Sequence, residues 1–442
     1  MENIYSKDWY ISNFKKLEES LNGESKSDFH KIRTNAFEMF KETGFPTVKM
    51  EDWKYTNVSP IFTHKYNDAE TSAKISKSGA DKFRIKDLNA ILLVFINGKF
   101  NQKYSSELHE LASLGIKIGS LADWIKRDPE LVLQHFSKYA KMPSGFASLN
   151  TAFTVDGTFV YIPDNVVVKE PIHILNLHGE ENSKILSQPR NLVVTGKHVQ
   201  AKFIETYNSI SSEPNFSNIV TEIVAGENSN IEWYKIQDEN LSSYQVTLTQ
   251  TEQKRGSVFT IYTVTTGGLL VRNDINAVLD DENCESHLFG LYLTEDSQHV
   301  DNHTFIDHAK PHCMSNELFK GVLNDKSHAV FNGKVFVRPD SQKTNAYQSN
   351  KNILLSKNAT IDTKPQLEIF ADDVKCSHGA TVGQLDDDSM FYLRSRGISE
   401  EMARSMLIRA FASDVFEDIK IEQVHEHINN VISGKLKQIL KG

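Results

Sequence analysis

Residues 219–235 read IVTEIVAGENSNIEWYK, two short apolar runs separated by the polar sequence Gly226-Glu227-Asn228. In the second run, Ile231 and Trp233 alternate with Glu232, so one face of an extended chain would be apolar and the other polar. β-branched and aromatic residues favour strands, and glycine and asparagine favour tight turns. The segment therefore predicts two β-strands joined by a turn.

Runs of the same kind follow one another from about Phe146 to Gly383, with no helical period between them. No proline occurs between Pro214 and Pro311, as expected where backbone N–H groups serve a sheet. The chain shows no strict repeat, so the pattern favours a β-helix only slightly over a large sandwich or a double cupin. Further predicted strands cover Asn191–Thr195, Lys202–Tyr207, Val258–Val264, Ser286–Leu293, Ala329–Val337 and Gln366–Phe370.

The remaining sequence divides into three flanking regions. Residues 1–85 are predicted to be mostly helical, with a stop at Gly44-Phe45-Pro46, and residues 384–442 are predicted to be helical again. Residues 86–145 form a mixed α/β lead-in to the β region, residues 146–383. Within the lead-in we expect a strand over Ile91–Ile96 and a helical stretch over Leu121–Phe136.

Composition excludes several classes of protein. The net charge of −9 has no long basic or acidic block, which argues against a nucleic-acid partner. No signal peptide and no membrane span are recognisable, and three cysteines without a CxxC motif fit the reducing cytoplasm. The chain contains no GxSxG and no GxxxxGK[ST] motif, so we expect neither serine-hydrolase nor ATPase activity.

The segment Pro365–Gly383, PQLEIFADDVKCSHGATVG, carries the most chemistry. Residues i and i+2 of a strand point to the same face, so Cys376 and His378 would project side by side. A thiolate and an imidazole can hold iron or zinc, but two ligands cannot complete an iron–sulfur site. Cys284 and Cys313 lie in distant segments of the sequence. The pair is therefore either structural or completed by ligands from another chain.

A second group of candidate metal ligands is rich in histidine. His303, His308 and His312 lie within ten residues of one another, with His287, His299 and His328 nearby. Their spacings differ and no helical HExxH motif is present, so structural hydrogen bonding is favoured over a cupin-like metal site.

The C-terminal region carries an amphipathic helix. Ser399 can cap it, and Gly397 can end the helix predicted over Asp386–Arg396. Packing against the β region is favoured over the docking of another protein. The apolar stripe comprises Met402, Ala403, Met406, Leu407, Ala410, Phe411 and Val415.

Several segments together resemble the SufB/SufD family of the SUF iron–sulfur cluster assembly system, and the CSHGATVG sequence looks like its SufD branch. The resemblance extends from about Arg33 to about Lys420. The matching segments are Gly44–Asn57, Leu149–Pro163, His299–Leu323, Phe331–Ser356 and Pro365–Gly397.

The resemblance implies a right-handed parallel β-helix core, residues 146–383, flanked by helical regions. It implies a cytoplasmic, non-catalytic scaffold subunit that pairs with SufB and with two copies of the ATPase SufC. Cys376 and His378 would hold a nascent iron–sulfur cluster at the SufB interface, with no cofactor expected in the isolated chain, which could form a homodimer. The residues expected to dock SufC are Met402, Met406, Leu407, Ala410 and Phe411.

Four alternatives remain open at this point. The chain could be a SufB-like paralogue, or a purely structural partner of SufB whose Cys376 and His378 hold nothing. It could also be a β-helix polysaccharide lyase or esterase, or a cupin enzyme that binds a metal in the region His303–His312.

Overall fold

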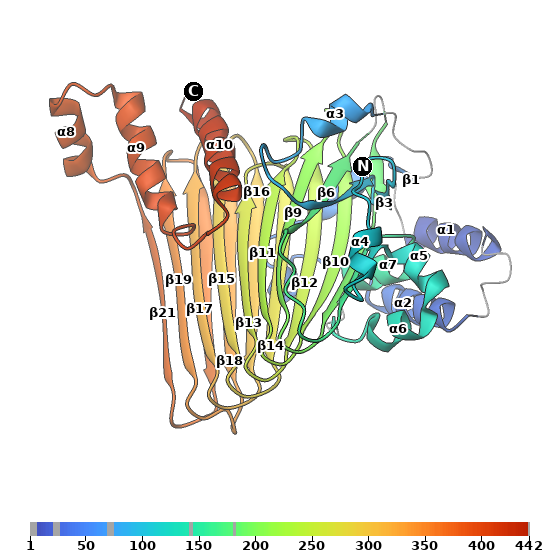
Figure 1. Cartoon of the computed structure of the whole chain (residues 1–442). Helices are drawn as coiled ribbons and strands as arrows, with labels where there is room; N and C mark the ends of the chain where they lie inside the picture. Colours follow the sequence, from blue (N-terminus) through green and yellow to red (C-terminus); the bar gives the residue numbers. More distant parts are fainter. Residues whose placement is uncertain (1–6, 21–26, 69–74, 141–144, 180–182, 441–442) are drawn as a thin grey trace.

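The computed structural model describes residues 7–20, 27–68, 75–140, 145–179 and 183–440. Figure 1 shows a stack of parallel strands with helices at both ends of the chain. The core is a parallel β-solenoid in which each coil adds one strand to each of two sheets. This confirms the predicted fold class, mainly β with helical N- and C-terminal regions.

The two sheets alternate along the chain. One contains β8 (Arg190–Thr195), β10 (Phe216–Ala225), β12 (Tyr244–Gln253), β14 (Leu270–Leu279), β16 (His299–His308), β18 (His328–Val337) and β20 (Thr360–Ile369). The other contains β9 (Gln200–Ser209), β11 (Asn230–Asp238), β13 (Val258–Thr265), β15 (Glu285–Thr294), β17 (Met314–Leu323), β19 (Asn345–Leu354) and β21 (Lys375–Gly383). We call them the even sheet and the odd sheet.

The coils differ in length. Tyr244 pairs with Leu270, an offset of 26 residues, whereas His328 pairs with Thr360, an offset of 32 residues. The strands stay in register because inward side chains stack in one continuous core, while the connecting turns absorb the difference. This variation explains why the sequence shows no strict repeat.

The N-terminal end of the solenoid is built from shorter strands. The pairs β2–β3 and β4–β5 are antiparallel, so each sheet finishes in a short strand. The lead-in region thus supplies the first strands of both sheets. The strands of the lead-in region are β2 (Ile91–Ile96), β3 (Lys99–Phe100) and β4 (Lys117–Ser120). The other strands at this end are β1 (Asn67–Asp68), β5 (Thr158–Ile162), β6 (Ile172–His178) and β7 (Ile185–Ser187).

The N-terminal helices pack on the outer face of the even sheet, where Phe146 and Trp53 meet Phe216 and Tyr244. The helical stretch predicted over Leu121–Phe136 is present as two helices, because Asp128 caps a new helix that begins at Pro129. The elements are α1 (Lys7–Ser20), α2 (Asp28–Thr43), α3 (Lys77–Asp81), α4 (His109–Ala112), α5 (Leu121–Arg127), α6 (Pro129–His135), α7 (Gly145–Phe153) and the 3₁₀ turns Glu51–Trp53 and Ser59–Thr63.

The C-terminal helices are α8 (Asp387–Ser395), α9 (Glu400–Ser413) and α10 (Glu422–Ile439). α9 and α10 cover the outer face of the odd sheet, where Ile408 and Ile428 join the cluster around Tyr262. Ser399 caps α9 as predicted, accepting a hydrogen bond from the backbone N–H of Met402. Within the described ranges, no helix is both long and apolar enough to cross a membrane.

Candidate functional site

The last coil of the solenoid ends in two free edges. β20 and β21 are the terminal strands of the even and odd sheets, and among the described residues no further strand pairs with their outer edges. Nearly every residue of β21 is exposed, whereas β10 is buried along its whole length. Long unpaired edges readily accept strands from another chain, and an uncapped solenoid end exposes its core.

Cys376 and His378 both lie on the inner face of β21. Cys376 pairs with Ala346, which is buried, and His378 pairs with Gln348, which is 3% exposed. Ser377, between them, pairs with Tyr347, which is 46% exposed and faces outward. The two potential ligands therefore share one face, as their spacing predicts, and that face is the solenoid interior at its open end.

The two side chains have different surroundings. Cys376 is partly buried and packs against Val337, Ala346 and Ala371. This burial raises the pKa of the Cys376 thiol, which favours the protonated form in the isolated chain. The His378 side chain is exposed, and its imidazole makes no hydrogen bond to any described residue. An imidazole and a thiol are thus available to a ligand that enters the open end.

The described part of the chain provides no third ligand for this pair. No cluster of three or more His, Cys, Asp or Glu side chains in metal-binding arrangement occurs within it. A four-ligand iron–sulfur site at Cys376 and His378 would therefore need donors from elsewhere.

The other two cysteines form a separate pair that the sequence did not reveal. Cys284 and Cys313 directly precede β15 and β17, which pair in register, so they are neighbours in successive coils. Each sulfur lies 3.2 Å from the carbonyl oxygen of Asp281, and both side chains are buried. The hydrogen bond from Cys313 lowers the pKa of the Cys284 thiol to about 7. This pair belongs to the wall of the core, two coils behind β21.

The histidine-rich segment is held by structural hydrogen bonds. His299 Nε2 lies 2.8 Å from Thr56 Oγ1, and His308 Nε2 lies 2.9 Å from Ser315 Oγ. Burial lowers the pKa of both rings to about 4, so they are neutral at physiological pH. His303 contacts Asp301 at 3.1 Å. The first two contacts join different elements, and the third lies within β16. Among the described residues, these histidines belong to no group of three or more candidate metal ligands.

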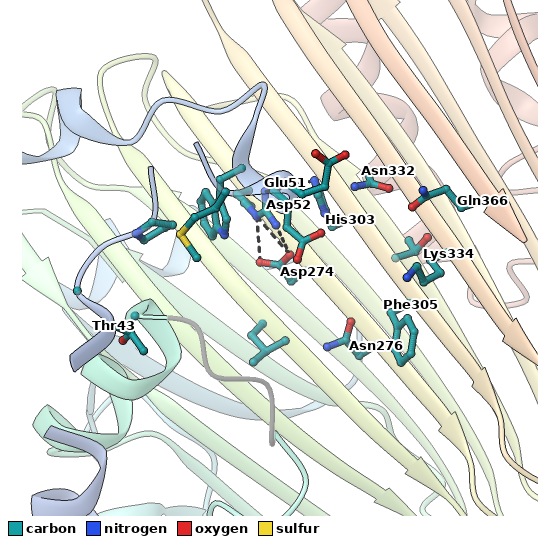
Figure 2. A pocket seen from close by; sticks show the side chains of 18 residues that line it. Thr43, Glu51, Asp52, Asp274, Asn276, His303, Phe305, Asn332, Lys334 and Gln366 are labelled. Carbon is teal, nitrogen blue, oxygen red and sulfur yellow. Dashed lines mark hydrogen bonds and ion pairs between the residues drawn. The ribbon is translucent and has the colours of Figure 1, made fainter. Parts of the chain in front are cut away.

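A hollow of about 430 Å³ lies between the segment around Glu51–Trp53 and the outer face of the even sheet (Figure 2). Arg272 forms its inner wall, with its guanidinium carbon 3.7 Å from the ring centroid of Trp53. Its nitrogens lie 2.8 Å from Asp274 and 2.7 Å from Asp301. Arg272 therefore has its charge satisfied, and its role here is to anchor the N-terminal region on the solenoid.

The predicted apolar stripe of α9 divides into two faces. Ala403 and Val415 are buried, and Phe411 lies against Lys320, whose Nζ is 4.7 Å from the ring centroid. Leu407 is half-buried, whereas Ala410 is exposed. The most exposed apolar side chains of α8 and α9, which we call the helical patch, are Phe391 (75% exposed), Tyr392, Met402 (56% exposed) and Met406.

Clustered exposed apolar side chains are typical of interaction sites. Figure 1 places α8 and α9 at the same end of the molecule as β21. The helical patch and the open end of the solenoid thus belong to one region.

Comparison with known proteins identifies relatives along almost the whole chain. The family model described as SUF system FeS cluster assembly, SufBD core domain, matches residues 177–411, and that of the SufBD protein N-terminal region matches residues 4–174. An iron–sulfur cluster assembly SufBD family protein of Synechocystis is 33% identical, covering 91% of this chain and 90% of that protein.

Two relatives carry the name iron–sulfur cluster assembly protein SufD. The one from Escherichia coli is 28% identical, covering 89% of this chain and 90% of that protein. The one from Bacillus subtilis is 25% identical, covering 92% of this chain and 93% of that protein.

Proposed function

The chain belongs to the SufBD family of SUF-system iron–sulfur cluster assembly proteins, and on that premise we propose that it is a SufD-type scaffold subunit acting in the cytoplasm. In this role it turns over no substrate of its own. It supplies one wall of a shared assembly site and a docking surface for an ATPase. The observation that carries the proposal is the open end of the solenoid, with two soft ligands on its inner face.

The free edges of β20 and β21 suit a second solenoid of the same family. A SufB subunit that adds its own terminal strands would satisfy the unpaired backbone groups and cover the exposed core. Cys376 and His378 would then lie at the junction. The same edges could pair with another copy of this chain, which accounts for a homodimer when the partner is absent.

The iron–sulfur cluster is the product assembled at this junction. Cys376 would provide a thiolate and His378 an imidazole nitrogen, and SufB would provide the remaining ligands. Because burial raises the pKa of the Cys376 thiol, iron binding there would displace a proton. In this division of labour neither subunit holds a cluster alone.

The helical patch suits the ATPase SufC. Met402 and Met406 are flexible apolar side chains on the exposed side of α9, and Phe391 is the most exposed apolar side chain of the neighbouring helix α8. Leu407, Ala410 and Phe411 lie at its margin. The opposite side of α9 is anchored on the odd sheet through Lys320, which bonds Asp414 at 2.6 Å. A movement of SufC bound to this patch would therefore be transmitted through α9 to the odd sheet.

The decisive experiment combines the full chain with SufB and SufC and measures the cluster formed per complex. We expect His378→Ala to abolish most of it, and Cys376→Ser to cause a smaller loss if sulfur arrives chiefly through SufB. Ser377→Ala is the matched control, because Ser377 lies between the two residues but on the outer face. Undiminished cluster formation with His378→Ala, or failure of the chain to bind SufB and SufC, would refute the proposal.

A further inference from the structure

A row of buried polar side chains extends from His378 into the solenoid interior. His378 on β21 pairs with Gln348 on β19, and Gln348 pairs with Glu317 on β17. Paired residues of parallel strands have side chains on the same face, about 4.8 Å apart along the stack. The three side chains therefore form one row that leads from the open end into the core.

The inner part of this row is held by a hydrogen bond. Gln348 Nε2 donates to Glu317 Oε2 at 2.7 Å, and the two residues are 3% and 1% exposed. Because the amide nitrogen of Gln348 donates to the carboxylate, the amide oxygen of Gln348 points away from Glu317. That oxygen is buried and has no hydrogen-bond partner among the described residues. Buried carbonyl oxygens in folded proteins generally accept a hydrogen bond, so this oxygen is available to a donor.

The core also makes room for this amide. Gly333 on β18 faces Gln348 across the interior, and a Cβ atom at position 333 would lie 2.3 Å from Gln348 Nε2. Any larger residue at position 333 would displace the amide. The absence of a side chain at position 333 thus leaves the space that the Gln348 amide occupies.

We propose that Gln348 positions His378, its amide oxygen accepting a hydrogen bond from the His378 ring when a partner covers the open end. Glu317 holds the amide in the required orientation. Histidine ligands generally donate their second ring N–H to a carbonyl or carboxylate group, which sets the ring orientation and the nitrogen left for the metal. This inference rests on the proposed function, in which His378 binds the growing cluster.

The test uses the complex with SufB and SufC and measures cluster formed per complex. Gln348→Leu removes the amide at similar volume, and we expect about a tenfold loss, the usual cost of removing a partner of a ligating histidine. Gly333→Ala displaces the amide without altering it and should cause a loss of the same kind. In the His378→Ala background, Gln348→Leu should cause no further loss, because both changes remove the same interaction.

Conservative replacement separates positioning from a merely structural role. Glu317→Gln keeps an acceptor for Gln348 Nε2 and should retain nearly full cluster formation, whereas Glu317→Leu should not. The matched control is Gln245→Leu, because Gln245 is also buried and donates to a carboxylate, Glu239, at 2.9 Å, but lies in a coil remote from β21. It should leave cluster formation unchanged.

The outcomes distinguish the two hypotheses. If His378→Ala abolishes the cluster while Gln348→Leu and Gly333→Ala leave it intact, the positioning role is refuted and the proposed function stands. If His378→Ala has no effect, the proposed function is refuted, and the positioning role falls with it. Should Gln348→Leu fail to fold, Gly333→Ala and the two Glu317 variants decide the question.

Discussion

The two ends of the solenoid differ in how they are closed. At the N-terminal end, short antiparallel strands finish both sheets, Leu108 and Leu111 pack against the solenoid core, and α5 and α6 pack on the outer face of the first coils. At the C-terminal end, β20 and β21 present free edges, and the helices lie beside the sheet rather than across its end (Figure 1). One end is completed within the chain, and the other is left for another molecule to complete.

The buried acids of the two ends show the same difference. Glu222, on β10, bonds Arg190 at 2.7 Å and accepts hydrogen bonds from the backbone N–H groups of Ser137, Tyr139 and Ala140. Burial alone would raise the pKa of Glu222, but these partners outweigh it and hold the pKa below its usual value. Glu317 is as deeply buried, and there desolvation raises the pKa to about 7. Buried ionisable groups without compensating partners are typical of functional sites, whereas structural sites surround such groups with partners.

The largest expected effect is on stability and comes from a substitution near the closed, N-terminal end of the solenoid. Glu222→Ala leaves the buried Arg190 charge without a counter-charge and removes the acceptor of three backbone N–H groups. We expect a loss of about 3–5 kcal/mol in the free energy of unfolding, measured by urea titration. The exposed pair Lys197–Glu227 serves as control, and Glu227→Ala should cause no measurable loss. A similarly small effect at Glu222 would contradict the assignment of this ion pair as an anchor.

The second effect concerns Glu317 and depends on pH. Its pKa is raised from 4.5 to about 7, so the folded chain binds this proton more tightly than the unfolded chain. The resulting stabilisation is complete below pH 4.5 and is lost as the pH rises to about 7. Relative to the parent, Glu317→Gln should therefore gain about 1–3 kcal/mol of unfolding free energy over this interval. A difference that does not change with pH would show that Glu317 titrates normally.

The smallest effect is expected at the free edge itself. Backbone amides of β21 should exchange with deuterium about tenfold or more faster than those of β13, because β13 has neighbours on both sides. Addition of SufB should slow exchange in β20 and β21 and leave β10–β13 unchanged. Equal protection of β21 and β13 in dilute isolated protein would show that the edge is already covered.

Local patterns predicted the strands well. The alternation around Ile231–Lys235 identified β11, although the strand extends to Asn230–Asp238 because polar residues at its ends still join the parallel ladder. The helical stretch over Leu121–Phe136 was also found, but the break at Asp128 was not predicted, because apolar periodicity continues across it while capping and Pro129 begin a new helix.

The site was predicted only in part. The spacing of Cys376 and His378 was sufficient to place them on one face, since alternation is a local property of extended backbone. Their inward direction depends on Ala346 and Gln348 in the preceding coil. Nothing in the sequence linked Glu317, Gln348 and Gly333, or Cys284 and Cys313, because these contacts join residues from different strands.

The sequence by itself determined the strands, the turns, the helical ends and the pairing of a thiol with an imidazole on one face. The tertiary structure alone decided which coils stack, which face is inside and which end stays open. The physical reason is the distance along the sequence over which each interaction acts. Periodicity and capping act between residues a few positions apart. Coil register depends instead on coil lengths, which vary between offsets of 26 and 33 residues, and on packing in the shared core.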